Sequence, residues 1–319
     1  MAWLLAPLAL LIERAVGYPP RLFRLIGHPV TWMGALITWL DTRLNQGANR
    51  RLKGAVMLLL LLLTGLAISL LVVAVTRRVP FGWVLEALIA SSLLAQKELG
   101  RAVKAVADTL AVSLDSGRSA VSHIVGRDPD TLDEAGIARA AIESLAESTS
   151  DGVVAPLFWL LIGGLPGIVL YKAANTADSM VGHRTERHAE FGWASARCDD
   201  WLNWIPARLS ALLIAGAAFL VRRADPEAAW STALRDARKH ASPNAGWPEA
   251  AFAGALGFEL GGPRAYAGEV HDLPHFGEGK ANLTALDILK ALELYWSAMN
   301  LLLGLTLVVT LLLWRFLLL

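Results

Sequence analysis

Cysteine is nearly absent from this 319-residue chain, and dense positive charge is absent too. Cys198 is the only cysteine, which excludes an intrachain disulfide and a zinc site built on cysteines. We interpret Cys198 as a small buried residue rather than a nucleophile. The formal net charge is +1 and the arginines are interleaved with acids, which argues against a nucleic-acid partner.

The familiar nucleotide-binding motifs are also missing. A Gly-x-x-x-x-Gly-Lys-Ser/Thr loop is excluded because Ala281 follows Gly279-Lys280 and Pro274 stands where its first glycine would be. The chain has no dinucleotide fingerprint, no Gly-x-Ser-x-Gly elbow and no internal repeat. A bound nucleotide would therefore need another kind of site.

Long apolar runs dominate what is present. Hydrophobic residues make up 55% of the chain, and Gly54 to Thr76 and Trp296 to Trp314 carry no charge, at close to the roughly 20 residues that a spanning helix needs. We predict an all-α, multi-pass integral membrane protein with four to six membrane segments and cytoplasmic amphipathic helices. The predicted segments of this single domain, 1–319, are 2–16, 54–76, 80–96, 153–170, 204–221 and 296–317, and the polar site-forming regions are 17–53, 97–152, 171–203 and 222–295.

Charge in the polar regions predicts the orientation. Lys and Arg are numerous there, so we expect these regions, and the active site, to face the cytoplasm from the cell (inner) membrane, with the Arg77-Arg78 turn as the exception. Ala2 to Ile12 has no basic leader and no clean cleavage site, which indicates an uncleaved segment. Glu13 and Arg14 interrupt this segment, and whether it spans or lies at the interface stays open.

An acidic row follows a predicted helix start. Thr131 to Glu134 matches a capping box, so a helix should begin there. Glu143, Glu147 and Asp151 then follow at i, i+4 and i+8, where like charges destabilise a helix unless a cation lies opposite. Mg²⁺ or an arginine cluster would supply that cation; the alternative is three solvated acids on an exposed face.

The region Tyr171 to Arg208 is polar between two apolar segments. One group on a common helix face precedes a second group of Asp and Asn, and cations and imidazoles lie between them. These residues are Asn175, Asp178 and Ser179, then His183, Arg184, Arg187 and His188, then Asp199, Asp200 and Asn203. Two acidic clusters around a basic centre are typical of a magnesium–nucleotide site, although a salt-bridged connector between membrane segments is the alternative.

The apolar segment Val153 to Leu170 is broken by Gly163-Gly164-Leu165-Pro166-Gly167. A straight crossing would put the acidic row and the region Tyr171 to Arg208 on opposite faces of the membrane. A re-entrant hairpin turning at the glycines would put them on one face, and such backbone is tolerated where protein covers it. We therefore predict the hairpin.

Several motifs together resemble a known family. They include Glu143 to Ser148, Asp151 to Pro156, Ala173 to Gly182, Asp199-Asp200 with Asn203, Ile205 to Arg208, and Ser242 to Gly246. In this order they are similar to the adenosylcobinamide-phosphate synthases, membrane proteins of cobalamin biosynthesis, from about Glu13 to Leu294. His28-Pro29-Val30 also matches. Glu13 and Tyr18-Pro19, however, stand where many members carry aspartates, and Ser148 stands where the family usually has Asn.

The resemblance implies an ATP-dependent amide ligation that joins aminopropanol, or its O-phosphate, to a propionate carboxylate of adenosylcobyric acid. Its implied cofactors are ATP and Mg²⁺, and its implied partners also include the lipid bilayer and other membrane enzymes of the pathway. The candidate catalytic residues are Asp178, Asp199, Asp200, Glu143 and Glu147, and the candidate metal ligands are these five and Asp151. The candidate cofactor- and substrate-binding residues are Asn175, Ser179, His183, Arg184, Arg187, Asn203, Arg208, Arg127, His28, Ser242 and Asn244.

A corrinoid transporter or a membrane scaffold without chemistry is the alternative function. A transporter predicts charged residues within the membrane segments. Gly54 to Thr76 and Trp296 to Trp314 contain none, so we favour the enzyme.

Overall fold

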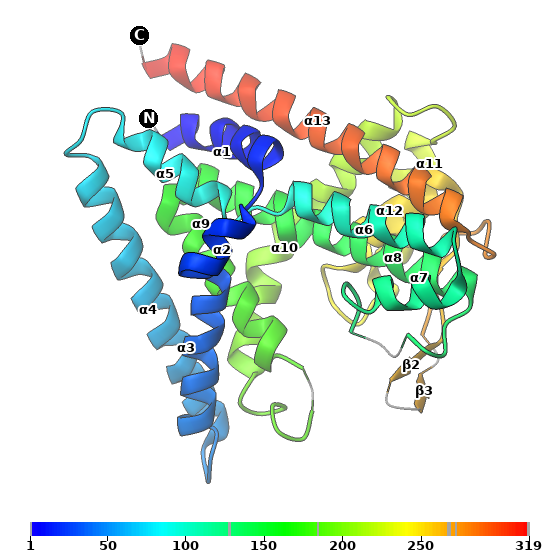
Figure 1. Cartoon of the computed structure of the whole chain (residues 1–319), viewed down its shortest axis with the longest axis horizontal. Coiled ribbons are helices and arrows are strands. Elements are labelled where there is room, and N and C mark those ends of the chain that lie inside the picture. Colours follow the sequence, from blue (N-terminus) through cyan, green and yellow to red (C-terminus); the bar gives the residue numbers. More distant parts are fainter. Residues whose placement is uncertain (1, 127–128, 184, 267–268, 272, 318–319) are drawn as a thin grey trace. The chain divides into compact units, whose positions relative to one another are not determined.

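The computed structural model describes residues 2–126, 129–183, 185–266, 269–271 and 273–317, and this part of the chain is almost entirely helical, as predicted (Figure 1). The α-helices up to residue 149 are α1 (Ala2–Val16), α2 (Pro20–Ile26), α3 (Pro29–Leu44), α4 (Arg50–Thr76), α5 (Gly82–Ser91), α6 (Gln96–Leu110), α7 (Leu114–Val121) and α8 (Glu134–Thr149). The later helices are the π-helical turn η1 (Ser150–Val154), α9 (Ala155–Val181), α10 (Trp193–Ala218), α11 (Pro226–Asp236), the 3₁₀ turn η2 (Ala237–Lys239), α12 (Gly246–Leu256) and α13 (Ala285–Leu317).

The chain forms two compact units. The first unit comprises Met1–Ala95, Ala155–Asn203 and Thr306–Leu319, and the second comprises Gln96–Val154 and Trp204–Leu305. The acidic row of α8 therefore belongs to the second unit, whereas Asn175, Asp178 and Asp199 belong to the first. A single membrane domain stays a prediction.

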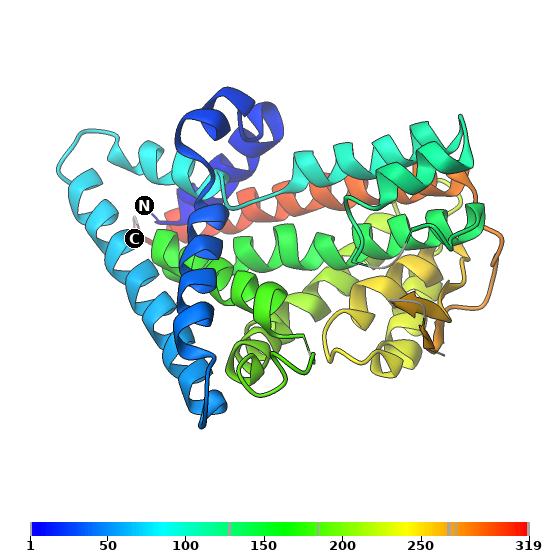
Figure 2. The same ribbon diagram turned by 60° about the horizontal axis from the view of Figure 1, so that its bottom comes forward.

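Helices α3, α4 and α9 build the core of the first unit. Figures 1 and 2 show α3 and α4 converging on the turn between them. Buried apolar side chains of all three helices pack together at this end: Ile37, Leu40, Met57, Leu58, Leu61, Ala173, Ala177 and Val181, with Phe191 from the following loop. Gly54 is required here, because a Cβ would overlap the backbone carbonyl of Phe191. This packing fixes the start of the polar region 171–203 against α3 and α4.

Helix α9 turns back on itself at Gly164. That residue has φ +61° and ψ −151°, which no α-helix contains. A Cβ on Gly167 would overlap the carbonyl oxygen of Trp159, although residues eight apart in a straight helix are separated by about 12 Å. The predicted change of direction at the Gly-Gly-Leu-Pro-Gly sequence is therefore present in the structure.

Three stretches are long and apolar enough to cross a membrane: Arg50–Thr76, Glu134–Val181 and Ala285–Leu312. The second comprises α8, η1 and α9, and within it the chain reverses direction at Gly164. Among the described residues, the predicted segments 2–16, 80–96 and 204–221 do not meet these criteria. Helix α1 has only 15 residues, because Tyr18-Pro19 follows it. Helix α5 has only 10 residues and ends at Ser91. Three of the expected four to six segments are thus supported.

The second unit contains α6 to α8, α11, α12, the later part of α10, the first part of α13 and four short strands. The strands β1 (Leu260–Gly261) and β4 (His275–Phe276) pair antiparallel, as do β2 (Arg264–Tyr266) and β3 (Glu269–His271). The sequence did not predict these strands. It also placed the start of α8 too early, since Asp133 is the N-cap and accepts the Gly136 N–H at 2.7 Å.

Candidate functional site

A buried carboxylate lies at the centre of a polar network in the first unit. Asp199 is only 8% exposed, and its two oxygens accept the side-chain amides of Asn175 at 3.1 Å and Asn203 at 2.9 Å. The Asn203 carbonyl oxygen in turn accepts the Tyr171 hydroxyl at 2.9 Å. Asp199 and Asn203 meet because they are four residues apart on α10. The structure thus joins Asn175 of the first predicted cluster with Asp199 and Asn203 of the second in a single network.

Electrostatics set this carboxylate apart from an ordinary surface acid. Burial raises the pKa of Asp199, its amide partners oppose this rise, and the charge of Asp200 adds to it. Lys172 also opposes the rise, and its ammonium donates to the Asn175 carbonyl oxygen at 3.3 Å. Polar but uncharged partners therefore hold an acid whose charge state is responsive to what binds beside it.

The other predicted residues of this region have different surroundings. Asp200 forms an ion pair with Arg197 at 3.5 Å. The Asp178 carboxylate lies against Gly182, where a Cβ would overlap it. Ser179 donates its hydroxyl to the Asn175 backbone carbonyl at 2.9 Å, so its hydrogen bond stays within its own helix. His183 is exposed, and Arg184 lies outside the described residues.

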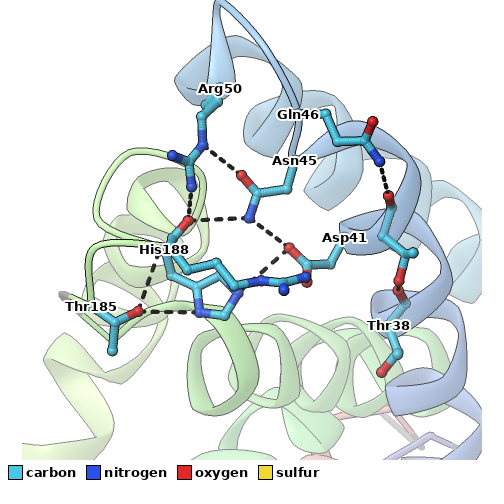
Figure 3. A network of polar contacts seen from close by, with 9 residues as sticks. Thr38, Asp41, Asn45, Gln46, Arg50, Thr185 and His188 are labelled. Atoms are coloured by element: carbon cyan, nitrogen blue, oxygen red, sulfur yellow. Dashed lines mark hydrogen bonds and ion pairs between the residues drawn. The ribbon is translucent and has the colours of Figure 1, made fainter.

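The loop between α9 and α10, residues 182–192, is fastened to the end of α3 (Figure 3). Arg187 donates to Asp41 at 2.6 Å, and the Arg187 carbonyl accepts the amide of Asn45 and the guanidinium of Arg50. His188 Nε2 is buried and lies 3.5 Å from Asp41, without the geometry of a hydrogen bond. Arg187, predicted to bind a ligand, here anchors the loop.

Asp41 is the central acceptor of this anchor. Burial raises its pKa, but hydrogen bonds from Asn45 and Arg187 and the nearby charges outweigh burial, so the pKa lies below its ordinary value. Asp41 could not be singled out from the sequence, because its partner Arg187 is 146 positions away.

His28 caps α3 rather than standing free. Its Nδ1 accepts the Val30 N–H at 3.2 Å, and its ring packs edge-on against Tyr18 at 4.4 Å between centroids. Burial lowers the pKa of His28, a hydrogen bond to the Ser92 backbone opposes this, and the charge of Lys172 adds to it. The neutral ring is thus favoured near Lys172.

Of the three acids predicted to stack along one helix, only Glu143 and Glu147 lie on α8. Glu143 is 3% exposed and accepts the Gly261 N–H at 2.7 Å, so it connects α8 to β1. Glu147 is exposed on the last turns of α8. Asp151 lies in η1, where the wider π-helical turn interrupts the i, i+4 register. The stacking expected at i, i+4 and i+8 is therefore wrong for Asp151.

A second polar group in the second unit surrounds Arg208. Its guanidinium donates to Asn244 Oδ1 at 3.4 Å and lies over the rings of Trp204 and Trp247, 4.3 and 4.8 Å from their centroids. Ser242 accepts the backbone N–H groups of Asn244 and Ala245 and so holds the turn that presents Asn244. The structure therefore brings these three predicted residues together.

The described residues contain no group of three or more Asp, Glu, His or Cys side chains arranged to hold a metal ion. Arg127, like Arg184, lies outside them. The sequence missed Lys172 and Tyr171 as members of the Asp199 network. Their spacing of three and four residues from Asn175 on one helix could have indicated them.

Comparison with known proteins places the chain in a family. The model of the CobD/Cbib protein family matches residues 6–295. Cobalamin biosynthesis protein CobD of Brucella anthropi is 48% identical over 315 residues, 95% of each chain, and that of Rhodobacter capsulatus is 49% identical over 303 residues, 93% of each chain. The protein of the same name from Sinorhizobium fredii is 47% identical over 307 residues, 93% of each chain. No solved structure matches. Since both kinds of match extend over nearly its full length, the chain belongs to the CobD/Cbib protein family.

Proposed function

We propose that this protein acts in cobalamin biosynthesis as an ATP-dependent ligase. It would join aminopropanol, or aminopropanol O-phosphate, to a propionate carboxylate of adenosylcobyric acid, giving adenosylcobinamide or its phosphate. A carboxylate oxygen would take the γ-phosphoryl group of ATP, releasing ADP. The amine would then attack the carbonyl carbon, lose a proton and expel inorganic phosphate, leaving the amide.

The network of Asp199 with Asn175, Asn203 and Tyr171 is the observation that carries the proposal. A buried carboxylate with a raised pKa, held by amides rather than by a guanidinium, is costly to keep in a membrane protein without a role. The relatives carry the name cobalamin biosynthesis protein CobD, which supports the pathway. The ligation itself rests on the motif resemblance and on this site.

The chain's own residues suit the substrates. Asp199 would accept the proton lost by the attacking amine, with its orientation set by Asn175 and Asn203. Lys172, three residues before Asn175 on α9, would attract a phosphoryl or carboxylate group. In the second unit, Arg208, packed against Trp204 and Trp247, is a cation of the kind that binds phosphate.

Mg²⁺ would neutralise the phosphate charge of bound ATP, and the donor chemistry of the first unit fits it. Mg²⁺ commonly takes only one or two protein carboxylates and completes its shell with phosphate oxygens and water. Asp178 and Asp200 are half-buried carboxylates of this kind, so they are our proposed ligands. Asp199 suits this role less, because both of its oxygens already accept amides.

The membrane arrangement is part of the proposal. With α4 crossing the bilayer and α9 turning back at Gly164, the region 171–203 would return to the side from which α4 begins. Arg50, Arg51 and Lys53 precede the apolar part of α4 and favour the cytoplasm for that side. Substrates and ATP would then reach the site from the cytoplasm of the cell (inner) membrane.

Product formation by the purified, detergent-solubilised protein tests the proposal. The protein is incubated with ATP, Mg²⁺ and adenosylcobyric acid together with each amine in turn, and products are identified by mass spectrometry. We expect an amide product whose formation consumes ATP and requires both organic substrates. ATP consumption in the absence of either organic substrate, or the lack of an amide product with both amines, would contradict the ligase function.

One observation favours a corrinoid transporter as a second candidate. Glu86, within the predicted segment 80–96, is buried, accepts the Thr76 hydroxyl at 2.6 Å and borders a cavity of about 830 Å³ near the Gly164 turn. Uptake of labelled cobyric acid into proteoliposomes, abolished by Glu86→Gln with ligation intact, would support transport. Ligation without uptake leaves the ligase alone.

A further inference from the structure

We propose that the first unit holds one anionic phospholipid, with an acyl chain in an apolar cavity under α2 and the headgroup beside Arg21 and Arg24. This site is separate from the Asp199 network. It does not depend on the proposed ligase activity, because lipid binding is measured without ATP or corrinoid.

The cavity has a volume of about 650 Å³, within the ~300–1,000 Å³ that ligand sites usually occupy. Its lining is overwhelmingly apolar and comes from α1 to α5 and α9. Leu22 and Ile26 of α2 form one wall, Trp32 of α3 another, and Thr64 and Ile68 of α4 a third. An apolar chain, rather than a charged metabolite, matches such a lining.

The described residues of the chain leave the apolar side chains of helix α2 exposed. None of its seven residues is buried, although Leu22, Phe23, Leu25 and Ile26 are large and apolar, and Leu25 is 81% exposed. A helix with apolar side chains and interleaved arginines is typical of segments that lie in the lipid interface. Exposed apolar residues continue along α4, among them Leu59, Leu63 and Leu71, so a lipid surface is continuous with the cavity.

Charge selects an anionic headgroup. Arg21 and Arg24 are exposed, and from Val16 to Leu40 the sequence contains no Asp or Glu. Arginine near a lipid surface is attracted to anionic lipid. A zwitterionic headgroup would gain much less from the same two cations.

The cavity is held open by the chain itself. Trp32 donates its indole N–H to the Ile26 carbonyl at 2.8 Å, and Gly27, with φ +74°, makes the turn between α2 and α3. The Tyr18 hydroxyl donates to the Gly27 carbonyl at 2.6 Å. These bonds fix α2 over the cavity, so the space does not depend on a ligand to form.

Native mass spectrometry of the delipidated full chain in detergent tests the proposal. The protein is titrated with dioleoylphosphatidylglycerol or dioleoylphosphatidylcholine. We expect the phosphatidylglycerol to bind roughly tenfold or more tightly than the phosphatidylcholine, and the double variant Arg21→Gln/Arg24→Gln to lose this preference. The double variant Arg77→Gln/Arg78→Gln, in the turn after α4 and outside the cavity lining, is the matched control and should keep it.

A cavity-filling pair separates this site from lipid that coats the whole protein. Thr64→Phe places a ring in the cavity. The Thr64 hydroxyl that it removes donates only to the Leu60 carbonyl of the same helix, so little else is lost. Leu63→Phe adds a ring one position away on the exposed surface of α4. Thr64→Phe should abolish the tightly held lipid, and Leu63→Phe should leave it.

Tryptophan fluorescence provides a second readout, in which Trp32 of the cavity wall reports the bound chain. Phosphatidylglycerol with brominated chains should quench the wild-type protein more than the Trp32→Phe protein. Equal binding of both lipids, equal effects of the two phenylalanine variants, or quenching that ignores Trp32 would each overturn the proposal. Displacement of lipid by adenosylcobyric acid would overturn it too, by assigning the cavity to the substrate.

Discussion

Two buried aspartates, one in each unit, differ in the partners that surround them. Asp199 in the first unit accepts two neutral amides, and its pKa is raised. Asp236 in the second unit is fully buried and accepts hydrogen bonds from Arg235 Nε and Nη2 at 2.8 Å, from Lys239 at 2.7 Å and from the Gly277 N–H at 2.8 Å. Burial raises the pKa of Asp236, but these cationic partners bring it well below its ordinary value.

In the function proposed above, this difference distinguishes a catalytic acid, Asp199, from a structural one, Asp236. The Asp236 charge is fully compensated, so it fastens α11 and η2 to the turn after β4. The Asp199 charge is only partly compensated, so its burial lowers the free energy of unfolding. A buried acid of this kind is typical of a functional site.

Asp199→Asn has the largest expected effect, on turnover. Removing the proton acceptor should lower the rate of amide formation by at least about a hundredfold. The unfolding midpoint should stay close to that of the wild type, because the variant no longer buries a charge. Product formation and thermal unfolding are measured on the same sample. Asp108→Asn, which removes an exposed acid paired with Lys104, is the control and should change neither.

Asp236→Asn should have the reverse outcome. It removes the negative charge and one of the two oxygens that accept from Arg235 and Lys239, and we expect a loss of about 2–3 kcal/mol in the free energy of unfolding. Turnover per folded molecule should change little. Denaturant titration of the second unit's helical signal checks this. A fully stable variant would contradict a structural role for this acid.

The pH dependence of stability should have opposite signs at the two acids. Asp236, with a lowered pKa, contributes stability above the ordinary carboxyl value of about 4, and this is lost as the pH falls through its folded pKa. Asp199, with a raised pKa, contributes stability below that value and loses it as the pH rises through its folded pKa. In Asp236→Asn, the unfolding midpoint should therefore no longer decrease as the pH is lowered through the folded pKa of Asp236. In Asp199→Asn, it should no longer decrease as the pH is raised through the folded pKa of Asp199. Equal profiles in the two variants would refute the assigned directions.

Asn175→Leu should shift the pH profile of turnover by a smaller amount. The Asn175 amide favours the charged form of Asp199, so its removal should raise that pKa further and move the acidic limb of the profile to higher pH. Gln46→Leu is the control, because the Gln46 amide bonds only to the Thr42 carbonyl. If the acidic limb of the pH profile stays in place in Asn175→Leu, the Asn175 amide does not influence the catalytic acid.

Ser179→Ala should have the smallest effect. The Ser179 hydroxyl bonds to a carbonyl of its own helix, so its loss should cost no more than about 0.5 kcal/mol and leave turnover near the wild-type value. A large loss of turnover would mean that this hydroxyl turns toward the substrate, as the sequence first indicated.

The sequence predicted features that depend on neighbours along the chain. The uncharged run in α4, the turn at Gly164 and the common face of Asp199 and Asn203 all follow from local composition or helical spacing. Asp41 with Arg187 and Glu143 with Gly261 could not be predicted, because tertiary packing brings together residues 146 and 118 positions apart. The π-helical turn that displaces Asp151 is likewise a consequence of how α8 continues into α9.

Transfer of oxygen from substrate to phosphate tests the central claim most directly. Adenosylcobyric acid labelled with ¹⁸O in its reacting carboxylate is incubated with ATP, the amine and either the wild-type protein or Asp199→Asn. We predict that each phosphate released by the wild type carries one labelled oxygen, and that the variant releases it at least about a hundredfold more slowly. Unlabelled phosphate, or labelled phosphate formed by the variant at the wild-type rate, would contradict the account.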